Sequence, residues 1–256
     1  MLAPAIAGSL YCAVPHNTTF VVADLHLGYA PPNVAQRFHT FLESVPQRAD
    51  QLLVLGDLFE FWFEYHTVVP EAAFPTLERL ASLVRAGVDL VVTGGNHDRF
   101  GGRFWRDRVG ARFHPDGADL TVAGFPAHAA HGDGIGDERL GARLLHAVIR
   151  KRLTHRIFGL VHPDLGIGLV RRFSGQLAAK RDDDALRERV AARQQAYAAD
   201  YLARRAEIDL LILAHTHRAA LVECGERRWY VNPGSWLDGY CYAQVTPEGP
   251  HLARYE

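Results

Sequence analysis

The amino-acid sequence predicts an α/β fold in which a largely parallel sheet carries polar residues at the ends of its strands. Three short apolar runs, 19–23, 51–55 and 88–93, predict buried strands. Helical spacing of apolar residues over 34–45 and 71–86 separates these strands. Alternating strands and helices are typical of parallel sheets with helical crossovers, whose sites form at the carboxyl ends of the strands.

The second half of the chain predicts more sheet structure, interrupted by one long insertion. Further short strands are expected at 119–130, 210–213, 219–224 and 228–231. Between these regions, 138–152 and 184–205 have the pattern of long helices, joined by a stretch that glycine and proline interrupt. We therefore expect a single domain over 1–256, with a helical cap insertion at about 138–206.

Composition indicates an ordinary globular protein and identifies no partner by itself. The 256 residues are 48% hydrophobic and 22% charged, with a formal net charge of -1. The charge is uneven, because 138–205 contains 15 Lys/Arg against 7 Asp/Glu, whereas the rest of the chain contains 13 against 22. This basic block favours an anionic partner. It lacks evenly interleaved aromatic residues, which makes nucleic acid a poor candidate.

The cysteines and the apolar segments bear on the cellular compartment. Cys12, Cys224 and Cys241 are widely spaced and odd in number, so they suggest neither a disulfide framework nor a thiolate zinc site. The first residues are apolar but lack a basic flank, and no stretch approaches the roughly 20 apolar residues that span a bilayer. We expect a cytoplasmic protein without a secretion signal or transmembrane anchor.

Five polar clusters each follow a strand-like apolar run, and they combine carboxylate, carboxamide and imidazole side chains. They are Asp24-Leu25-His26, Gly56-Asp57 with Glu60 after it, Gly95-Asn96-His97-Asp98, His131-Gly132-Asp133 and His215-Thr216-His217. This mixture of donors suits manganese, iron or zinc, whereas an all-oxygen set would indicate magnesium or calcium. Any one cluster alone is more often turn chemistry than a metal site. Five of them in this order, each at a strand end, predict a metal centre.

The order D-x-H, G-D, G-N-H-D, H-G-D and H-T-H resembles the calcineurin-like metallophosphoesterases, and these motifs cover nearly the whole chain. The resemblance implies a four-layer αββα sandwich that holds two divalent metal ions, with manganese expected and iron or zinc as alternatives. One ion would be held by Asp24, His26, Asp57 and His217. The other would be held by Asp57, Asn96, His131 and His215, so that Asp57 bridges the pair.

Two such ions suit the hydrolysis of a phosphate ester or anhydride. A cation lowers the pKa of water and offsets the charge on the phosphoryl oxygens. The resemblance assigns catalytic roles to Asp57, Asn96 and His97. In the wider superfamily the histidine at this last position stabilises the transition state or protonates the leaving group.

A narrower resemblance concerns the substrate. The stretches 23–28, 55–65 and 162–169, together with the arginine-rich insertion, are similar to bacterial UDP-2,3-diacylglucosamine diphosphatases. That family cleaves a lipid-linked nucleotide of lipid A biosynthesis to UMP and a diacylated sugar phosphate, and its insertion accommodates the acyl chains. The resemblance implies substrate contacts at Asn96 and His97, and Lys180 and Arg181 are candidate phosphate contacts. His97 departs from the better-known members, which have arginine there.

Several alternatives stay open. The same metal centre would serve a nucleotide phosphodiesterase or a protein phosphatase, and some domains of this type are interaction scaffolds. The apolar residues of the insertion line an acyl site or form its own core, and the aromatic side chains between 61 and 65 present the same choice. A basic and apolar insertion also suits peripheral contact with the anionic cytoplasmic face of the inner membrane.

Overall fold

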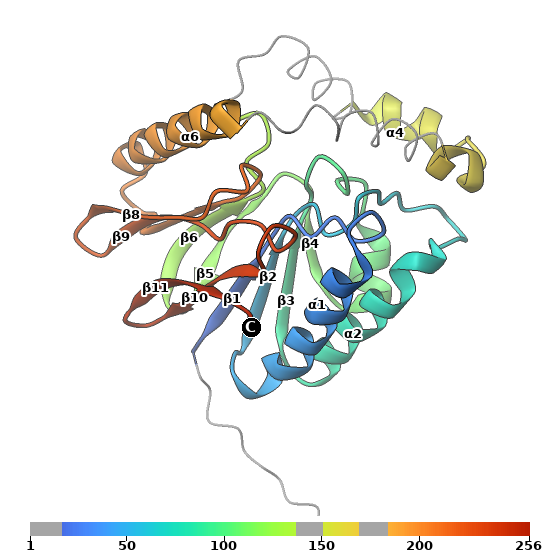
Figure 1. Ribbon diagram of the computed structural model, residues 1–256, viewed down its shortest axis with the longest axis horizontal. Helices are drawn as coiled ribbons and strands as arrows, with labels where there is room; N and C mark the ends of the chain where they lie inside the picture. Colours follow the sequence, from blue (N-terminus) through green and yellow to red (C-terminus); the bar gives the residue numbers. More distant parts are fainter. Residues whose placement is uncertain (1–16, 137–150, 169–183) are drawn as a thin grey trace, which may run out of the picture.

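The computed structural model describes residues 17–136, 151–168 and 184–256, which build two β-sheets lying face to face (Figure 1). The strands of the first sheet are β1 (Thr19–Val22), β2 (Gln51–Leu55), β3 (Asp89–Thr93), β4 (Arg112–His114), β10 (Cys241–Thr246) and β11 (Gly249–Arg254). They lie in the order β11-β10-β1-β2-β3-β4. The four strands from β1 to β4 run parallel, whereas β10 is antiparallel to both of its neighbours.

The second sheet is mixed. Its strands are β5 (Ala118–Val122), β6 (Phe125–Ala130), β7 (Leu210–Leu213), β8 (Ala220–Gly225) and β9 (Arg228–Asn232), in the order β5-β6-β7-β9-β8. The three central strands β6, β7 and β9 are parallel. Their carboxyl ends therefore share one edge of this sheet, as those of β1, β2 and β3 share one edge of the first.

Helices cover the outer face of each sheet (Figure 1). The helical elements are α1 (Pro32–Ser44), η1 (Val45–Gln47), η2 (Glu71–Ala73), α2 (Phe74–Arg85), η3 (Trp105–Val109), α4 (Arg152–Phe158) and α6 (Asp184–Arg204). Helices α1 and α2 pack on the first sheet, and α6 packs on the second. The predicted four-layer αββα sandwich is confirmed.

The alternation of side chains along the strands builds separate cores between the layers. In β1, Phe20 and Val22 belong to the core beneath α1 and α2, whereas Val21 belongs to the core between the sheets. This follows from the two-residue period of a strand, whose successive side chains point to opposite faces. A third core joins Ala198 and Leu202 of α6 to the outer face of the second sheet.

Most predicted elements lie where the sequence placed them. The strands expected at 51–55 and 210–213 have those bounds, and the helix expected at 71–86 begins with the turn η2 and continues as α2. The third core shows that the C-terminal half of α6 forms a layer of the sandwich.

Residues 138–150 and the candidate phosphate contacts Lys180 and Arg181 lie outside the described residues, and the insertion bounds of 138–206 stay a prediction. No helix in the described parts of the chain has the length and apolar character to cross a membrane.

Candidate metal centre

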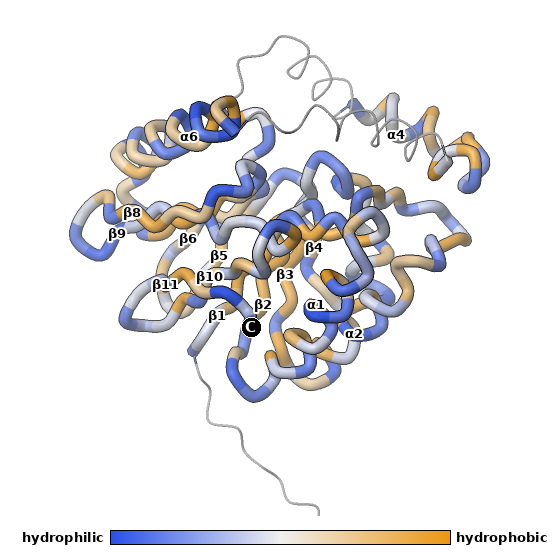
Figure 2. The backbone as a smooth tube through the Cα atoms, viewed as in Figure 1, coloured by the Kyte–Doolittle hydropathy of each residue, from blue (hydrophilic) through white to orange (hydrophobic). Residues whose placement is uncertain are grey.

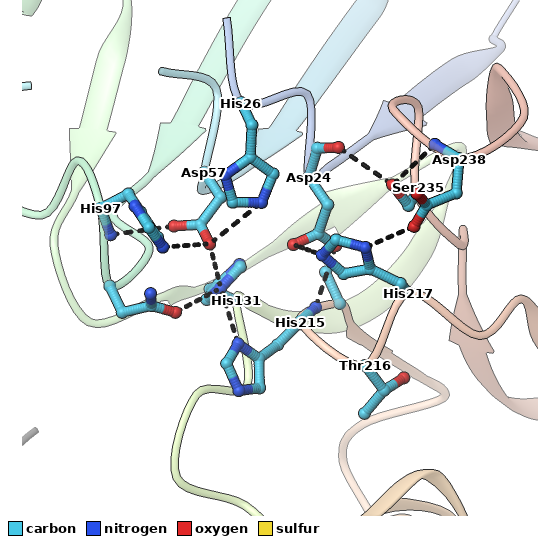
Figure 3. A network of polar contacts seen from close by, with 12 residues as sticks. Asp24, His26, Asp57, His97, His131, His215, Thr216, His217, Ser235 and Asp238 are labelled. Atoms are coloured by element: carbon cyan, nitrogen blue, oxygen red, sulfur yellow. Dashed lines mark hydrogen bonds and ion pairs between the residues drawn. The ribbon is translucent and has the colours of Figure 1, made fainter. Parts of the chain in front are cut away.

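Carboxylates and imidazoles from both sheets meet where the parallel strands end (Figure 3). Oδ2 of Asp57, which follows β2, faces the Nε2 atoms of three histidines at 3.7 Å (His26), 4.0 Å (His97) and 3.4 Å (His131). Nε2 of His131 lies 3.3 Å from Oδ1 of Asn96. It also lies 3.2 Å from Nδ1 of His215.

Asp24 forms a second focus of the same cluster. Its Oδ1 lies 3.4 Å from Nε2 of His217. Three groups of side chains each place their donor atoms within 4.8 Å of one another: Asp24, His26 and His217; Asp57, His131 and His215; and His26, Glu60 and His97. The structure therefore brings together all seven side chains that the sequence predicts as ligands, with Asn96 joined through His131.

Each of the two aspartates uses one oxygen for the backbone and presents the other to the centre. Oδ1 of Asp57 accepts from the amide of His97 at 3.0 Å, and Oδ2 of Asp24 accepts from the amide of His215 at 3.1 Å. Among the described residues, Oδ1 of Asp24 and Nε2 of His26 are buried without a hydrogen-bond partner. Buried polar atoms are costly when unsatisfied, so these two atoms fit a bound cation.

The histidines are oriented through their Nδ1 atoms. Nδ1 of His26 donates to Oε2 of Glu60 at 2.8 Å, and Nδ1 of His131 donates to the carbonyl of Leu55 at 2.7 Å. Nδ1 of His217 donates to Oδ2 of Asp238 at 2.6 Å. Because these acceptors keep a proton on Nδ1, Nε2 is the ring nitrogen that each histidine can offer to a metal.

Backbone conformation aims the ligands. Five of the predicted ligands have positive φ angles, which are Asp24 (54°), His26 (50°), Asp57 (51°), His215 (73°) and His217 (59°). Residues with a Cβ rarely adopt this left-handed region, and the cost persists only where the surrounding structure enforces it. Such strain at five ligands of one cluster is typical of a functional site.

The loops after β2 and β3 lie backbone against backbone. A Cβ atom at Gly95 would lie 2.5 Å from the amide nitrogen of Asp57, so a larger residue cannot stand there without moving the loop. Asp98 joins the same two loops, because its Oδ1 accepts from the amides of Asp57 at 3.0 Å and Gly95 at 2.8 Å. This contact holds the predicted bridging carboxylate at a fixed distance from the G-N-H-D loop.

Burial and opposing charges displace the pKa values of several groups. Burial acts to lower the pKa of His217, but Asp24 and Asp238 raise it to about 9. Burial and the neighbouring His131 lower the pKa of His215 to about 4. Burial and Asp57 raise the pKa of Asp98 to about 6. Displacements in both directions within one cluster are characteristic of functional sites.

Sequence reasoning missed the residues that follow β9. Ser235 donates through its hydroxyl to the carbonyl of Asp24 at 3.1 Å and accepts from the amide of Asp238 at 3.2 Å (Figure 3). This arrangement places the Asp238 carboxylate beside His217. β9 runs parallel to β7, so its carboxyl end lies at the same edge, but this pairing is set by the fold and not by the local sequence pattern.

The aromatic residues after Glu60 divide between the first core and a contact with α4. Trp62 is buried against Trp105 in the first core, with ring centroids 5.6 Å apart. Phe61 and Phe63 instead contact Phe158 of α4, with centroid distances of 5.5 and 5.0 Å. The amide of Trp62 also donates to the carbonyl of His97 at 3.1 Å, so α4 packs on a loop that is bonded to the G-N-H-D loop.

Comparisons with known proteins show what this chain is similar to. A family model described as calcineurin-like phosphoesterase matches residues 18–219. The chain is 26% identical over 247 residues to a UDP-2,3-diacylglucosamine hydrolase of Porphyromonas gingivalis, covering 88% of this chain and 92% of that protein. It is 29% identical over 243 residues to one of Ralstonia nicotianae, covering 91% and 87%. Among solved structures, Vacuolar Protein Sorting 29 of Cryptosporidium parvum is similar with a TM-score of 0.43 and 13% identity, covering 92% and 95%.

Proposed function

We propose, because this chain belongs to the calcineurin-like phosphoesterase family, that its metal centre hydrolyses the diphosphate of UDP-2,3-diacylglucosamine and releases UMP and a lipid sugar phosphate. The observation that carries the choice of substrate is an exposed apolar segment packed on the loop beside the metal-binding side chains. The relatives whose names specify this substrate match most of the chain.

The proposed centre has two cation positions. The first position is formed by Asp24, His26, His217 and Asp57, and the second position by Asp57, Asn96, His131 and His215. Cations bound there would lower the pKa of water and offset negative charge on the phosphoryl oxygens. The mixture of imidazole, carboxylate and carboxamide donors suits manganese, with iron or zinc as alternatives.

His97 lies with its Nε2 4.0 Å from Oδ2 of Asp57, the ligand shared by both positions, and is proposed to contact the substrate together with Asn96. Its Nδ1 donates to the carbonyl of Glu60 at 2.8 Å, so Nε2 is the atom that exchanges a proton with the reacting groups. In an anhydride the departing phosphate is already a good leaving group, and proton transfer to it is worth little. On the proposed substrate His97 therefore mainly stabilises the phosphoryl oxygens.

The segment 151–168 supplies an apolar surface next to this chemistry. Leu153, Ile157, Leu160 and Leu165 are 63%, 58%, 89% and 70% exposed, and hydrophobic stretches mark α4 in Figure 2. Contiguous exposed apolar side chains are typical of a surface that a ligand or a membrane covers. We assign this surface to the acyl chains and to peripheral contact with the cytoplasmic face of the inner membrane, with Lys180 and Arg181 as phosphate contacts.

The test is direct. Purified protein loaded with manganese is incubated with detergent-dispersed UDP-2,3-diacylglucosamine, and equal amounts of UMP and lipid sugar phosphate are expected. Asp57→Ala is the inactive control, because it removes the side chain shared by both positions. Turnover of soluble diesters without any UMP from the lipid nucleotide would overturn the assignment of substrate but keep the metal centre.

A second candidate is a phosphodiesterase acting on soluble nucleotides. It is favoured by His97, since the better-known diphosphatases have arginine at this position. The scaffold alternative is disfavoured, because all seven expected ligands are present and five of them adopt strained backbone conformations. The lipid assay and a soluble diester assay on the same preparation distinguish the two hydrolase functions.

A further inference from the structure

A glutamine of α6 is buried behind the two histidine loops of the second position. Gln194 is 0% exposed, and both ends of its carboxamide are used. Nε2 donates to the carbonyl of Ala214 at 3.1 Å, and Oε1 accepts from the hydroxyl of Tyr230 at 2.7 Å and from Nδ2 of Asn232 at 3.1 Å. A fully buried polar side chain of this kind rigidifies the groups that it connects.

The first group is the H-T-H loop. Asn232, which Gln194 orients, donates from Nδ2 to the carbonyl of Ala214 at 3.2 Å and to the hydroxyl of Thr216 at 3.0 Å. The two residues on either side of His215 are thereby fixed from beneath. His215 itself has φ 73°, a conformation that only its surroundings can maintain.

The second group is the H-G-D loop. Gly132 has φ +92°, and a Cβ atom there would lie 2.7 Å from Nε2 of Gln194, so the carboxamide packs directly against this backbone. Ala214 links the two loops, since its amide donates to the carbonyl of His131 at 2.9 Å. The carbonyl of the same Ala214 accepts from Gln194. One side chain of α6 thus supports the backbones that carry His131 and His215.

We infer that Gln194 is a positioning residue for the second cation position, a role that rests on the proposed metal centre. It acts through the backbones of the two loops and touches neither cation nor substrate. In the first position, the side chains of His26 and His217 have anchors of their own in Glu60 and Asp238. Because both histidine loops of the second position rest on Gln194, its loss weakens the second cation more than the first.

The experiment titrates metal-free protein with manganese and compares Gln194→Met with the wild type. Bound metal is measured by equilibrium dialysis and elemental analysis, and electron paramagnetic resonance distinguishes isolated Mn²⁺ from coupled pairs. Wild-type protein is expected to bind two ions with a coupled spectrum. Gln194→Met is expected to bind one isolated ion under the same conditions, with the second dissociation constant raised about 10- to 100-fold, as for other residues that support metal ligands.

Leu202→Ala is the matched control. Leu202 lies on the same helix, is 1% exposed and packs in the third core, so its truncation lowers the melting temperature without touching either loop. It should keep the wild-type second dissociation constant. Equal loss of the second ion in both variants, or an unchanged second dissociation constant in Gln194→Met, would overturn the inference. A wild-type protein that binds fewer than two ions would instead overturn the proposed metal centre.

Tyr230→Phe keeps the test decisive if Gln194→Met does not fold. It removes only the hydroxyl that donates to Oε1 of Gln194, in a residue that is 2% exposed. The second dissociation constant should rise a few-fold while the first stays unchanged. An identical titration for Tyr230→Phe and the wild type would count against Gln194 as a positioning residue.

Discussion

The metal centre and the segment around α4 lie side by side and are built on opposite principles. Asp24 and His26 are at most 1% exposed, and every anchored imidazole has a defined acceptor. Leu160 beyond α4 is 89% exposed, and the helix meets the domain mainly through Phe158. Chemistry on a phosphate requires donors held within about half an ångström. Recognition of a long acyl chain requires apolar area that can be covered.

This contrast predicts that substitutions in the two regions affect different sets of substrates. Changes to the metal ligands should alter turnover of every substrate, because each substrate uses the same cations. Changes on α4 should alter only substrates that carry an apolar chain. Four substitutions test whether the two regions act separately.

Asp57→Ala should have the largest effect. Asp57 is shared by both positions, and its Oδ2 faces three imidazoles within 4.0 Å. Supporting residues around metals typically contribute 10- to 100-fold, so loss of a shared ligand should reduce turnover by more than about 100-fold on both lipid nucleotide and small diester. His26→Ala should cost less. Normal metal content and turnover in Asp57→Ala would remove this residue from the site.

The effect of His97→Asn on turnover should depend on the leaving group of the substrate and not on the size of the substrate. A positioned acid contributes typically about 100-fold or more when the leaving group is a poor alkoxide. Turnover of an alkyl phosphodiester should therefore fall about 100-fold, and turnover of the lipid nucleotide much less, with metal content unchanged. His97→Arg should be tolerated on the lipid nucleotide. Loss of that activity in a metal-bound His97→Arg protein would weaken the diphosphatase assignment.

The sequence could predict the ends of β1, β2, β3, β6 and β7 because apolar runs followed by polar residues carry a local signal. It could not predict the supporting residues. Gln194 lies in a helix with the polar composition of a solvent-exposed helix. The side chain of Gln194 becomes buried only because α6 packs on the second sheet. Asp238 follows a strand end by several residues, and its contact with His217 depends on the turn at Ser235.

The aromatic stretch after Glu60 shows the same limit. The sequence left two interpretations open, an acyl site or the core, and the structure confirms the core for Trp62, whereas Phe61 contacts Phe158 of α4. Neighbouring residues of similar hydropathy have different surroundings because the loop bends between them. Hydropathy alone cannot tell which residues of such a run enter the core, because it reports the cost of exposing a side chain and not where the side chain points.

Asp238→Asn should have a moderate effect confined to the first position. The carboxylate accepts from Nδ1 of His217 at 2.6 Å but is 47% exposed, so solvent screens part of its charge. We expect the first cation to bind about tenfold more weakly, the lower end for such residues, and turnover to recover with excess manganese. Glu60→Gln, which changes a buried partner of His26, should be more damaging. A metal titration in which Asp238→Asn matches the wild type would show that Asp238 does not support the site.

Leu160→Ser should have the smallest effect and the most selective one. Burying a leucine side chain is worth about 1.5–3 kcal/mol, and a substrate that covers only part of it gains less. The KM for the lipid nucleotide should rise about three- to tenfold, which corresponds to no more than about 1.4 kcal/mol. Because Leu160 is 89% exposed, the melting temperature should stay within about a degree of the wild type.

The control for this prediction is an exposed apolar residue in another part of the fold. Leu221 of β8 is 40% exposed and lies on the edge strand of the second sheet. Leu221→Ser should therefore leave the KM for both substrates unchanged. Kinetics on the lipid nucleotide and on a small chromogenic diester are measured for both variants. A selective rise in KM for Leu160→Ser assigns the apolar surface to the acyl chains. Equal changes on both substrates would mean that this segment only supports the fold, and the contrast between a rigid centre and a lipid-binding surface would then be wrong.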